Sequence, residues 1–298
     1  MTSLNSFKFK IYLPSKREYN KFREITNYEY LNIVKAITNN DDEQLFEMYI
    51  DLVDATSTKL TKTTDVTKVD VFCILLNLYI LSVSDVLEIK SSGEDSTIGK
   101  TKINLYDILD KVTNFEFNYT RDVKINDDMS VRLTIPRDLY IKSPEDIMIE
   151  CIDELHILDQ KHSFKKISTL QKIQALDQLP TEISTCIVNE MKDIHDKYQL
   201  KVMKYGHEDN QQITLNIYNN SMFELLKIIY NTNLQTQYYY RYFASKHMGF
   251  NTEYTENISP AELQTHVKFF QQEQDEIEKQ REKQTKSGGS QHLGQPIT

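Results

Sequence analysis

The sequence predicts an α+β protein: an N-terminal mixed α/β domain with antiparallel hairpins, then a mainly α-helical domain and a flexible C-terminal tail. Apolar and polar residues alternate near the N-terminus and again around residues 85–135, as in half-buried strands. Ser-Pro pairs at 143–144 and 259–260 favour helix starts. Only seven glycines occur among 298 residues, so long helices are favoured over glycine-dependent loops.

The predicted domain limits follow this change of pattern. Residues 1–141 form the mixed domain, residues 142–284 the mainly helical domain, and residues 285–298 the tail. A chain of this length can hold one large or two medium-sized domains around a buried core.

The first predicted element is a β-hairpin. In residues 7–13, FKFKIYL, phenylalanine and aliphatic side chains alternate with lysine and tyrosine, which is the period of a half-buried strand. Pro14 lies at the turn, and residues 19–25 are the candidate partner strand.

Three helices follow, each predicted by a capping residue with an acidic residue three positions later. The pairs are Thr26 and Glu29 before helix 27–39, Asn40 and Glu43 before helix 41–54, and Thr67 and Asp70 before a helix that runs to Leu81. A polar, threonine-rich link at 55–66 separates the second helix from the third. The third helix is apolar on most sides, so it should lie in the core of the first domain.

Strands are predicted after this buried helix. They cover residues 85–90, 100–105, 114–121 and 129–135, with a short helix at 105–112 between two of them. The sequence Asn-Asp-Asp at 126–128 favours a turn before the last strand.

The chain is predicted to be mainly helical from Ser143 onward. A long helix at 181–204 is indicated by one apolar stripe, which consists of Ile183, Ile187, Met191, Ile194 and Tyr198. Residues 211–218 are predicted as a lone short strand. A last helix begins at Pro260, and its heptad has Leu263, Val267, Phe270 and Ile277 as apolar positions and Gln274 as a polar one. This helix should be partly exposed and able to pair with another, so a homo-oligomer is one alternative.

Composition limits the classes of partner. The formal net charge is −9, and an acidic chain repels phosphate backbones, so nucleic acid is not an expected partner. The basic stretch from Lys161 to Lys166 is short and is predicted to be a solvated connection.

We expect no signal peptide, and the longest apolar run, 71–83, is too short to span a bilayer. The three cysteines, Cys73, Cys151 and Cys186, are far apart and odd in number, as in a reduced cytosolic protein.

No catalytic motif is predicted from the sequence. Residues 93–101 resemble a phosphate-binding loop, but five residues separate the two glycines where that loop needs four, and a strand is predicted to follow. We therefore expect a hairpin loop there. Asp153 and His156 are predicted to share a helical face, but two ligands are too few for a metal site. The expectation is a protein without enzymatic activity, catalytic residues, cofactor or metal.

The candidate interaction region is the tyrosine-rich segment 216–261 together with the last helix. Tyrosine combines a large contact area with few rotatable bonds and a polar tip, which suits a recognition surface. Ordinary core packing and a base-stacking platform are the alternatives for the same side chains. The candidate partner-binding residues are Tyr238, Tyr239, Tyr240, Tyr242, Phe243, Leu263, Val267, Phe269 and Phe270.

Several blocks of sequence, taken in order, resemble one known family. They are LPSKREYNKFREITNYEYLNIVKAITNNDDE (13–43), FCILLNLYILSVSDVLEIK (72–90), INLYDILDKV (103–112), LDQLP (176–180), and LNIYNNSMFELLKIIYNTNL with HMGFNTEYTENISPAEL (within 215–263). The chain is similar, from near its N-terminus to about residue 270, to the baseplate hub subunits and hub-assembly proteins of T-even-type contractile-tailed phages.

The resemblance implies a late viral protein made in the host cytoplasm, which acts in building the central hub of the tail baseplate and can remain in the virion. Other hub proteins or the tape-measure protein are the implied partners. The alternative is a transient assembly chaperone for the tape-measure or another hub protein, absent from the mature virion. No catalytic residues are associated with these blocks, and the segment after residue 285 has no counterpart in the resemblance.

Overall fold

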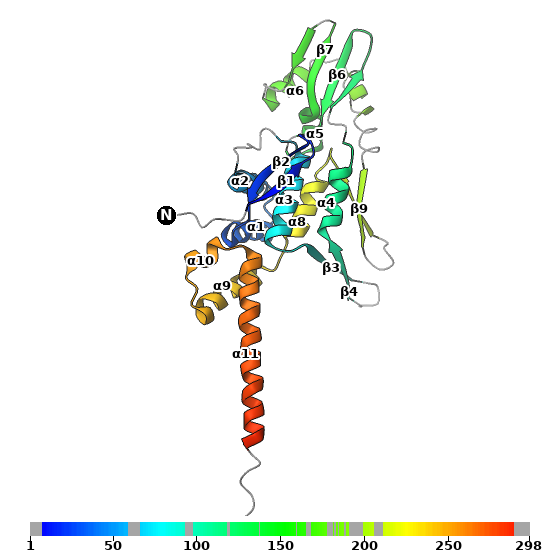
Figure 1. Ribbon diagram of the computed structural model, residues 1–298. Helices are drawn as coiled ribbons and strands as arrows, with labels where there is room; N and C mark the ends of the chain where they lie inside the picture. Colours follow the sequence, from blue (N-terminus) through cyan, green and yellow to red (C-terminus); the bar gives the residue numbers. More distant parts are fainter. Residues whose placement is uncertain are drawn as a thin grey trace, which may run out of the picture.

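The computed structural model describes residues 8–58, 66–92, 98–117, 120–136, 138–158, 160–164, 168–177, 181, 183, 185–187, 189–190, 199–205 and 211–288. Helices and antiparallel strand pairs make up the fold, which confirms the predicted α+β class. The molecule is elongated, with a four-stranded sheet at one end and a projecting helix at the other (Figure 1).

The predicted N-terminal hairpin is present. Strands β1 (Lys8–Leu13) and β2 (Glu18–Arg23) pair in antiparallel register. Ile11, Leu13 and Phe22 turn one face of the hairpin into the core, where each is almost completely buried. The other face carries the lysines that alternate with them in the sequence.

Helices α1 (Asn27–Asn39), α2 (Asp42–Thr56) and α3 (Lys68–Ser82) follow, and the capping boxes predicted for α1 and α3 are both formed. The prediction for α2 was wrong by one residue. Asp41 is its N-cap, and its carboxylate accepts a hydrogen bond from the Gln44 backbone N–H at 3.0 Å. Asn40 instead ends α1 in the left-handed conformation, which asparagine tolerates better than most residues.

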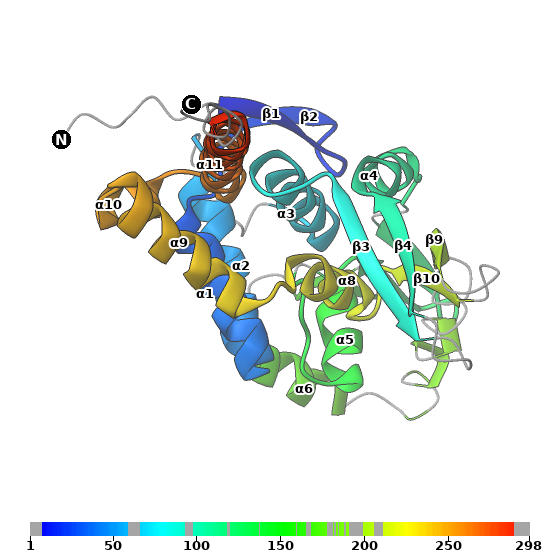
Figure 2. The same ribbon diagram turned by 90° about the horizontal axis from the view of Figure 1, so that it is seen from below.

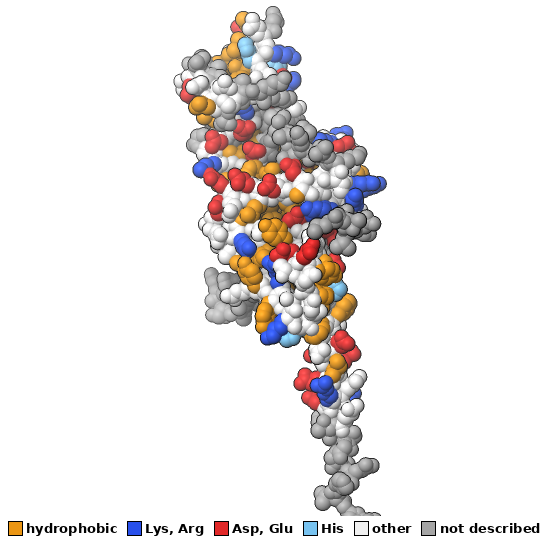
Figure 3. All heavy atoms as spheres, turned by 90° about the vertical axis from the view of Figure 1, so that its left-hand side faces the viewer, with side chains coloured by type: hydrophobic (Ala, Val, Ile, Leu, Met, Phe, Trp, Pro, Cys, Tyr) orange, Lys and Arg blue, Asp and Glu red, His pale blue; other side chains and the backbone are white. Residues whose placement is uncertain are grey.

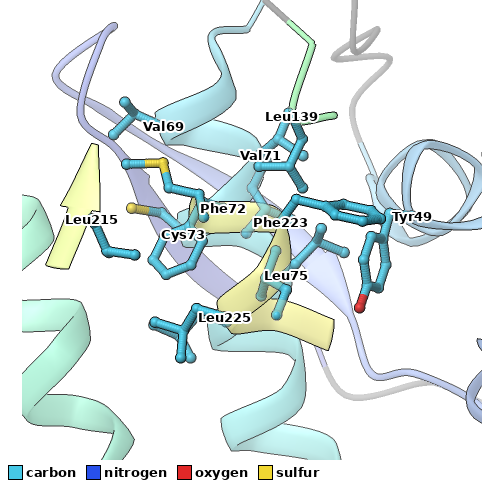
Figure 4. Packing of buried hydrophobic residues seen from close by; sticks show 14 of the residues in the cluster. Tyr49, Val69, Val71, Phe72, Cys73, Leu75, Leu139, Leu215, Phe223 and Leu225 are labelled. Atoms are coloured by element: carbon cyan, nitrogen blue, oxygen red, sulfur yellow. The ribbon is translucent and has the colours of Figure 1, made fainter. Parts of the chain in front are cut away.

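Helix α3 lies in the middle of the core, as its apolar sequence predicted. Figure 2 shows the hairpin β1–β2 on one side of α3 and helix α8 (Ser221–Tyr230) on the other. Phe72, Cys73 and Leu75 of α3 are fully buried, and they pack with side chains of α2, α8 and the neighbouring strands (Figure 4). This helix is therefore shielded from solvent on most of its circumference.

Two further hairpins lie beside α3. Strands β3 (Val86–Ser92) and β4 (Ile98–Asn104) pair in antiparallel fashion, and helix α4 (Leu105–Asn114) follows β4 directly. Strand β10 (Gln211–Asn216) pairs with β9 (Gln199–Tyr205). The prediction of a lone strand at 211–218 was therefore wrong, because β9 is its partner.

The predicted long helix 181–204 was also wrong at its C-terminal end, where β9 forms. Leu200 and Val202 flank Lys201, and Val202 is buried. The Lys111 ammonium of α4 donates a hydrogen bond to the Val202 carbonyl at 2.7 Å, which holds β9 against α4. Ile183 and Ile187 are buried as predicted. Met191, Ile194 and Tyr198 lie outside the described residues.

A four-stranded antiparallel sheet has the order β5-β6-β7-β8. Its strands are β5 (Thr120–Lys124), β6 (Met129–Thr134), β7 (Ile152–Ile157) and β8 (Gln160–Ser163). The predicted turn at 126–128 joins β5 to β6, where the Asn126 side chain accepts a hydrogen bond from the Asp128 backbone N–H at 2.9 Å.

Two sequence predictions fail in this sheet. The strand expected at 114–121 begins only at Thr120, because Asn114 still belongs to α4. Helix α5 (Pro144–Cys151) begins at Ser143-Pro144 as predicted but is followed by β7 rather than more helix; α6 (Thr169–Asp177) is the next helix. Asp153 and His156 therefore lie on a strand, not on one helical face. Pairing with β6 at long range decides this conformation, which local helical spacing cannot reveal.

Helix α8 joins the two halves of the chain through buried tyrosines. Tyr230 of α8 packs against Tyr49 of α2 and Tyr79 of α3, with ring centroids 5.4 Å and 5.0 Å apart, and against Tyr30 of α1 at 6.2 Å. We call these four residues the tyrosine cluster. One continuous core thus runs from Ile11 to Tyr230, across the predicted boundary near residue 141. The domain limits themselves remain predictions.

The C-terminal helices form a smaller unit against α1. Helices α9 (Leu234–Met248), α10 (Thr252–Asn257) and α11 (Pro260–Gly288) enclose Ala244, Ile258 and Leu263. The Asn27 backbone N–H donates to the Ile258 carbonyl at 2.8 Å, and its side-chain amide donates to the Thr255 carbonyl at 3.1 Å. Helix α11 continues to Gly288, past the predicted limit at 284, and residues 289–298 lie outside the described part.

Candidate interaction surface

Helix α9 presents most of its aromatic side chains to solvent. Asn233 caps its N-terminus by accepting a hydrogen bond from the Gln235 backbone N–H at 2.8 Å, and Gly249 ends it with φ of 72°. Only Gln237 and Ala244 of this helix are buried. Tyr238, Tyr239 and Tyr242 are consequently 45%, 49% and 58% exposed, so ordinary core packing does not account for them.

Helix α11 holds α9 in place with one side and exposes the other. Leu263 and Val267 are each 1% exposed, so they anchor α11 to the body and face no partner in this structure. Phe269 points away and is 65% exposed. Beyond Phe270, the described side chains of α11 as far as Gln284 are all exposed except the half-buried Ile277.

An aromatic seam joins the two helices. Phe243 of α9 meets Phe270 of α11 edge to face, with ring centroids 5.6 Å apart. Tyr239 lies 5.7 Å from Phe243 and His247 lies 4.8 Å from it. Tyr240 turns inward and packs against the small core of this unit. The seam therefore supports the exposed rings on a rigid base, which lowers the entropy lost when a partner binds.

A hollow of about 450 Å³ opens where the start of α9 faces α11. It is lined by uncharged groups: Asn233, Gln235, Thr236, Tyr239, Tyr240 and Gln271. Amide, hydroxyl and phenol groups of this kind can donate and accept hydrogen bonds with a peptide backbone.

Most charged neighbours of these rings already have partners. Lys246 donates to the Tyr242 hydroxyl at 2.7 Å, and the Lys35 ammonium lies 6.0 Å from the centre of the Tyr238 ring. Arg241 pairs with Glu256 of α10. The exposed part of the surface is thus mainly aromatic and uncharged, as in the centre of many protein interfaces. Figure 3 shows hydrophobic side chains gathered on the lower body, above the projecting part of α11.

Part of this surface was thus predicted from the sequence. The structure brings Tyr238, Tyr239, Tyr242 and Phe269 to the outside and places Phe243 and Phe270 in the seam beneath them. The polar lining of the hollow was not predicted from the sequence. Its local signal is Asn233 at the start of α9, a residue type that favours a helix N-cap.

The described residues show neither a metal-binding cluster nor a reactive thiol. The described residues contain no group of three or more His, Cys, Asp or Glu side chains that could hold a metal ion. Burial raises the pKa of the Cys73 and Cys151 thiols, so both stay protonated and unreactive near neutral pH. Strand β4 begins at Ile98, inside the loop-like motif at 93–101, and it continues through Lys102 and Ile103, where a strand was expected. Residues 93–97 lie outside the described part.

The chain matches a known protein family. The sequence model of the T4 bacteriophage base plate protein family matches residues 4–223. The chain belongs to this family. The match runs from the N-terminal hairpin through the four-stranded sheet to the first turn of α8, so the exposed surface of α9 and α11 lies beyond it.

The baseplate protein thus has a structural role in the phage tail. No match was found among curated proteins or among solved structures. In the described part of the chain, none of the helices combines the length and apolar character needed to cross a bilayer.

Proposed function

We propose that the baseplate protein helps to assemble the central hub of a contractile tail by protein–protein contact, and not by catalysis. The α9–α11 surface is the proposed docking site for another hub protein or the tape-measure protein. The supporting observation is the set of exposed aromatic rings, Tyr238, Tyr239, Tyr242 and Phe269, held on a packed seam. Rings of this kind are the usual anchors of protein interfaces. Assembly would take place in the host cytoplasm, late in infection.

Nucleic acid is a poor occupant of the same surface. Base stacking by tyrosine is normally combined with a cationic groove that follows the phosphates. Here Arg241 is engaged by Glu256, and the whole chain carries a net charge of −9. A protein partner therefore fits this surface better.

The double variant Tyr242→Ser/Phe269→Ser tests the docking site. Both side chains are more than half exposed, so we expect the melting temperature to stay within a few degrees of the parent. Loss of aromatic anchors at the centre of an interface typically costs about 2 kcal/mol or more each, so hub assembly should fail. The readout is complementation of a phage that lacks this gene, with complete tails counted by electron microscopy.

The matched control is Tyr19→Ser/Tyr106→Ser, which removes two exposed tyrosines on β2 and α4. We expect this control to support normal tails. Normal tail numbers with the α9–α11 variant would refute the docking site, and equal failure of both variants would show that exposed aromatics matter without regard to position.

A transient chaperone for the tape-measure or another hub protein is the second candidate. The exposed C-terminal half of α11 favours it, because a projecting helix can pair with an extended partner and release it later. The two candidates differ in whether the protein stays in the finished particle.

A further inference from the structure

A second surface lies away from the aromatic rings, in a groove between α1 and α2. The groove has a volume of about 260 Å³. Ile33 and Leu52 form its buried floor, and the partly exposed Tyr28 and Met48 form its sides. Both helices are fixed by the tyrosine cluster beneath them, so the groove is a rigid feature of the body. A single large apolar side chain from a partner would fit such a space.

Two carboxylates of α2, in or next to this groove, have no cation among the described residues. Glu47 and Asp51 are exposed, lie four residues apart on α2 and so share one face, and neither makes an ion pair with any described residue. Asp51 itself lines the groove. Figure 3, which faces the side where α2 lies, shows acidic side chains gathered on this part of the body.

The other carboxylates nearby are already used by the fold. Asp42 pairs with Lys227 at 2.6 Å, and Glu43 pairs with Lys142. Glu29 accepts hydrogen bonds from Arg23 and from the Thr26 backbone, which hold its pKa below the usual value although burial opposes this. The contrast identifies Glu47 and Asp51 as the negative charges left for an incoming group.

We propose that this groove binds a cationic amphipathic segment of another tail protein. An apolar side chain of that segment enters between Tyr28 and Met48, and its lysine or arginine side chains pair with Glu47 and Asp51. A second copy of this chain is a poorer occupant, because two bodies that each carry a net charge of −9 repel each other. The site is separate from the α9–α11 surface, and neither depends on the other.

Two synthetic peptides of about 15 residues test the groove, a length at which an amphipathic helix can form on a surface. They share the same leucines and differ only in having lysine or glutamate at the polar positions. Binding of each fluorescent peptide to the full-length protein is measured by anisotropy at low and at physiological salt. We expect the lysine peptide to bind, with an affinity that falls with salt, and the glutamate peptide not to bind.

Variants locate the binding. Glu47→Lys/Asp51→Lys should weaken the lysine peptide by about tenfold or more, and Tyr28→Ser should weaken it without changing the salt dependence. The control Glu273→Lys/Glu276→Lys makes the same change of charge on exposed positions of α11 and should leave the affinity within about twofold.

Three results would overturn the proposal: no binding of the lysine peptide, equal binding of the two peptides, or an equal loss in the α11 control. The first would mean that the groove holds no such segment, the second that charge has no part in it, and the third that the acidic chain attracts cations in general. None of them would bear on the aromatic docking site, which all of these variants retain.

Discussion

Replacing Tyr230 by alanine should destabilise the protein by about 3–5 kcal/mol, the usual range for removing a large buried aromatic side chain. Tyr230 is fully buried and touches the rings of Tyr30, Tyr49 and Tyr79. Its hydroxyl donates to the Leu75 carbonyl of α3 at 2.8 Å. Since domains are stable by only about 5–15 kcal/mol, this loss is a large share of the total. Urea unfolding followed by circular dichroism measures it.

Two conservative variants separate packing from hydrogen bonding in the tyrosine cluster. Tyr230→Phe keeps the ring and loses one buried hydrogen bond, so it should cost about 1 kcal/mol. Tyr49→Phe should be neutral or stabilising, because the buried Tyr49 hydroxyl has no hydrogen-bond partner among the described residues. An equal cost for the two variants would contradict this assignment.

Alkaline pH should destabilise the protein steeply above about pH 10. Burial raises the pKa of all four residues of the tyrosine cluster above the usual value of 10.0, with smaller contributions from neighbouring groups. In the unfolded chain these phenols ionise near pH 10, whereas in the folded chain they stay protonated. The unfolded state therefore releases more protons, and stability falls as the pH rises above 10. Each group contributes up to about 1.4 kcal/mol per pH unit, or on the order of 5 kcal/mol for four.

Three other buried groups determine how stability depends on pH below pH 10. Burial lowers the pKa of Lys68 to about 8 from 10.5, so the unfolded state binds more protons there and stability should rise from pH 8. The pKa values of Cys73 and Cys151 are raised by burial, so the unfolded state releases more protons and stability falls above their ordinary pKa of 9.0. We therefore expect a shallow maximum near pH 9 before the steep loss.

The control for the alkaline effect is again Tyr49→Phe. It removes one of the four phenols, so its loss of stability above pH 10 should be shallower than that of the parent by about 1.4 kcal/mol per pH unit. Unfolding free energies at several pH values between 7 and 11 supply the comparison. A stability that does not change between pH 9 and 11 would mean that the cluster is not buried in solution.

Elements fixed by local interactions could be predicted from the sequence. The capping boxes at Thr26 and Thr67 set the starts of α1 and α3 correctly, because the two partners of each box lie within one helical turn. The burial of α3 followed from its apolar residues on most sides. The alternation of apolar and polar residues near the N-terminus identified β1, because this pattern too is local in the sequence.

Elements fixed by distant partners could not be predicted in this way. Strand β7 follows α5 without a break, and it forms because β6 and β8 pair with it on both sides. Strand β9 has a short alternating pattern, but Tyr198 also continues the helical stripe of Ile183 and Ile187, so the two periods compete in the sequence. Pairing with β10 and contact with α4 decide the outcome.

The residues of the candidate surface were predicted from composition, but the sequence did not show which of them are exposed to solvent. Helical spacing puts Leu263, Val267 and Phe270 on one stripe, yet it does not say where the body ends. The fold buries the first two and places Phe270 in the seam with Phe243. The groove between α1 and α2 could not be predicted from the sequence, because its walls come from two helices. The sequence also does not show that Glu47 and Asp51 lack an ion-pair partner among the described residues, since that depends on the fold.

The amount of this protein in purified, complete virions tests the central claim, that it is a hub component held by protein contacts. Quantitative mass spectrometry of particles, with known baseplate proteins as internal standards, measures it. We predict a fixed, low copy number per particle, retained through high-salt washing because the proposed aromatic contacts are not screened by salt. Absence from complete particles, with the protein present in the infected cell, would contradict the claim and favour the transient chaperone.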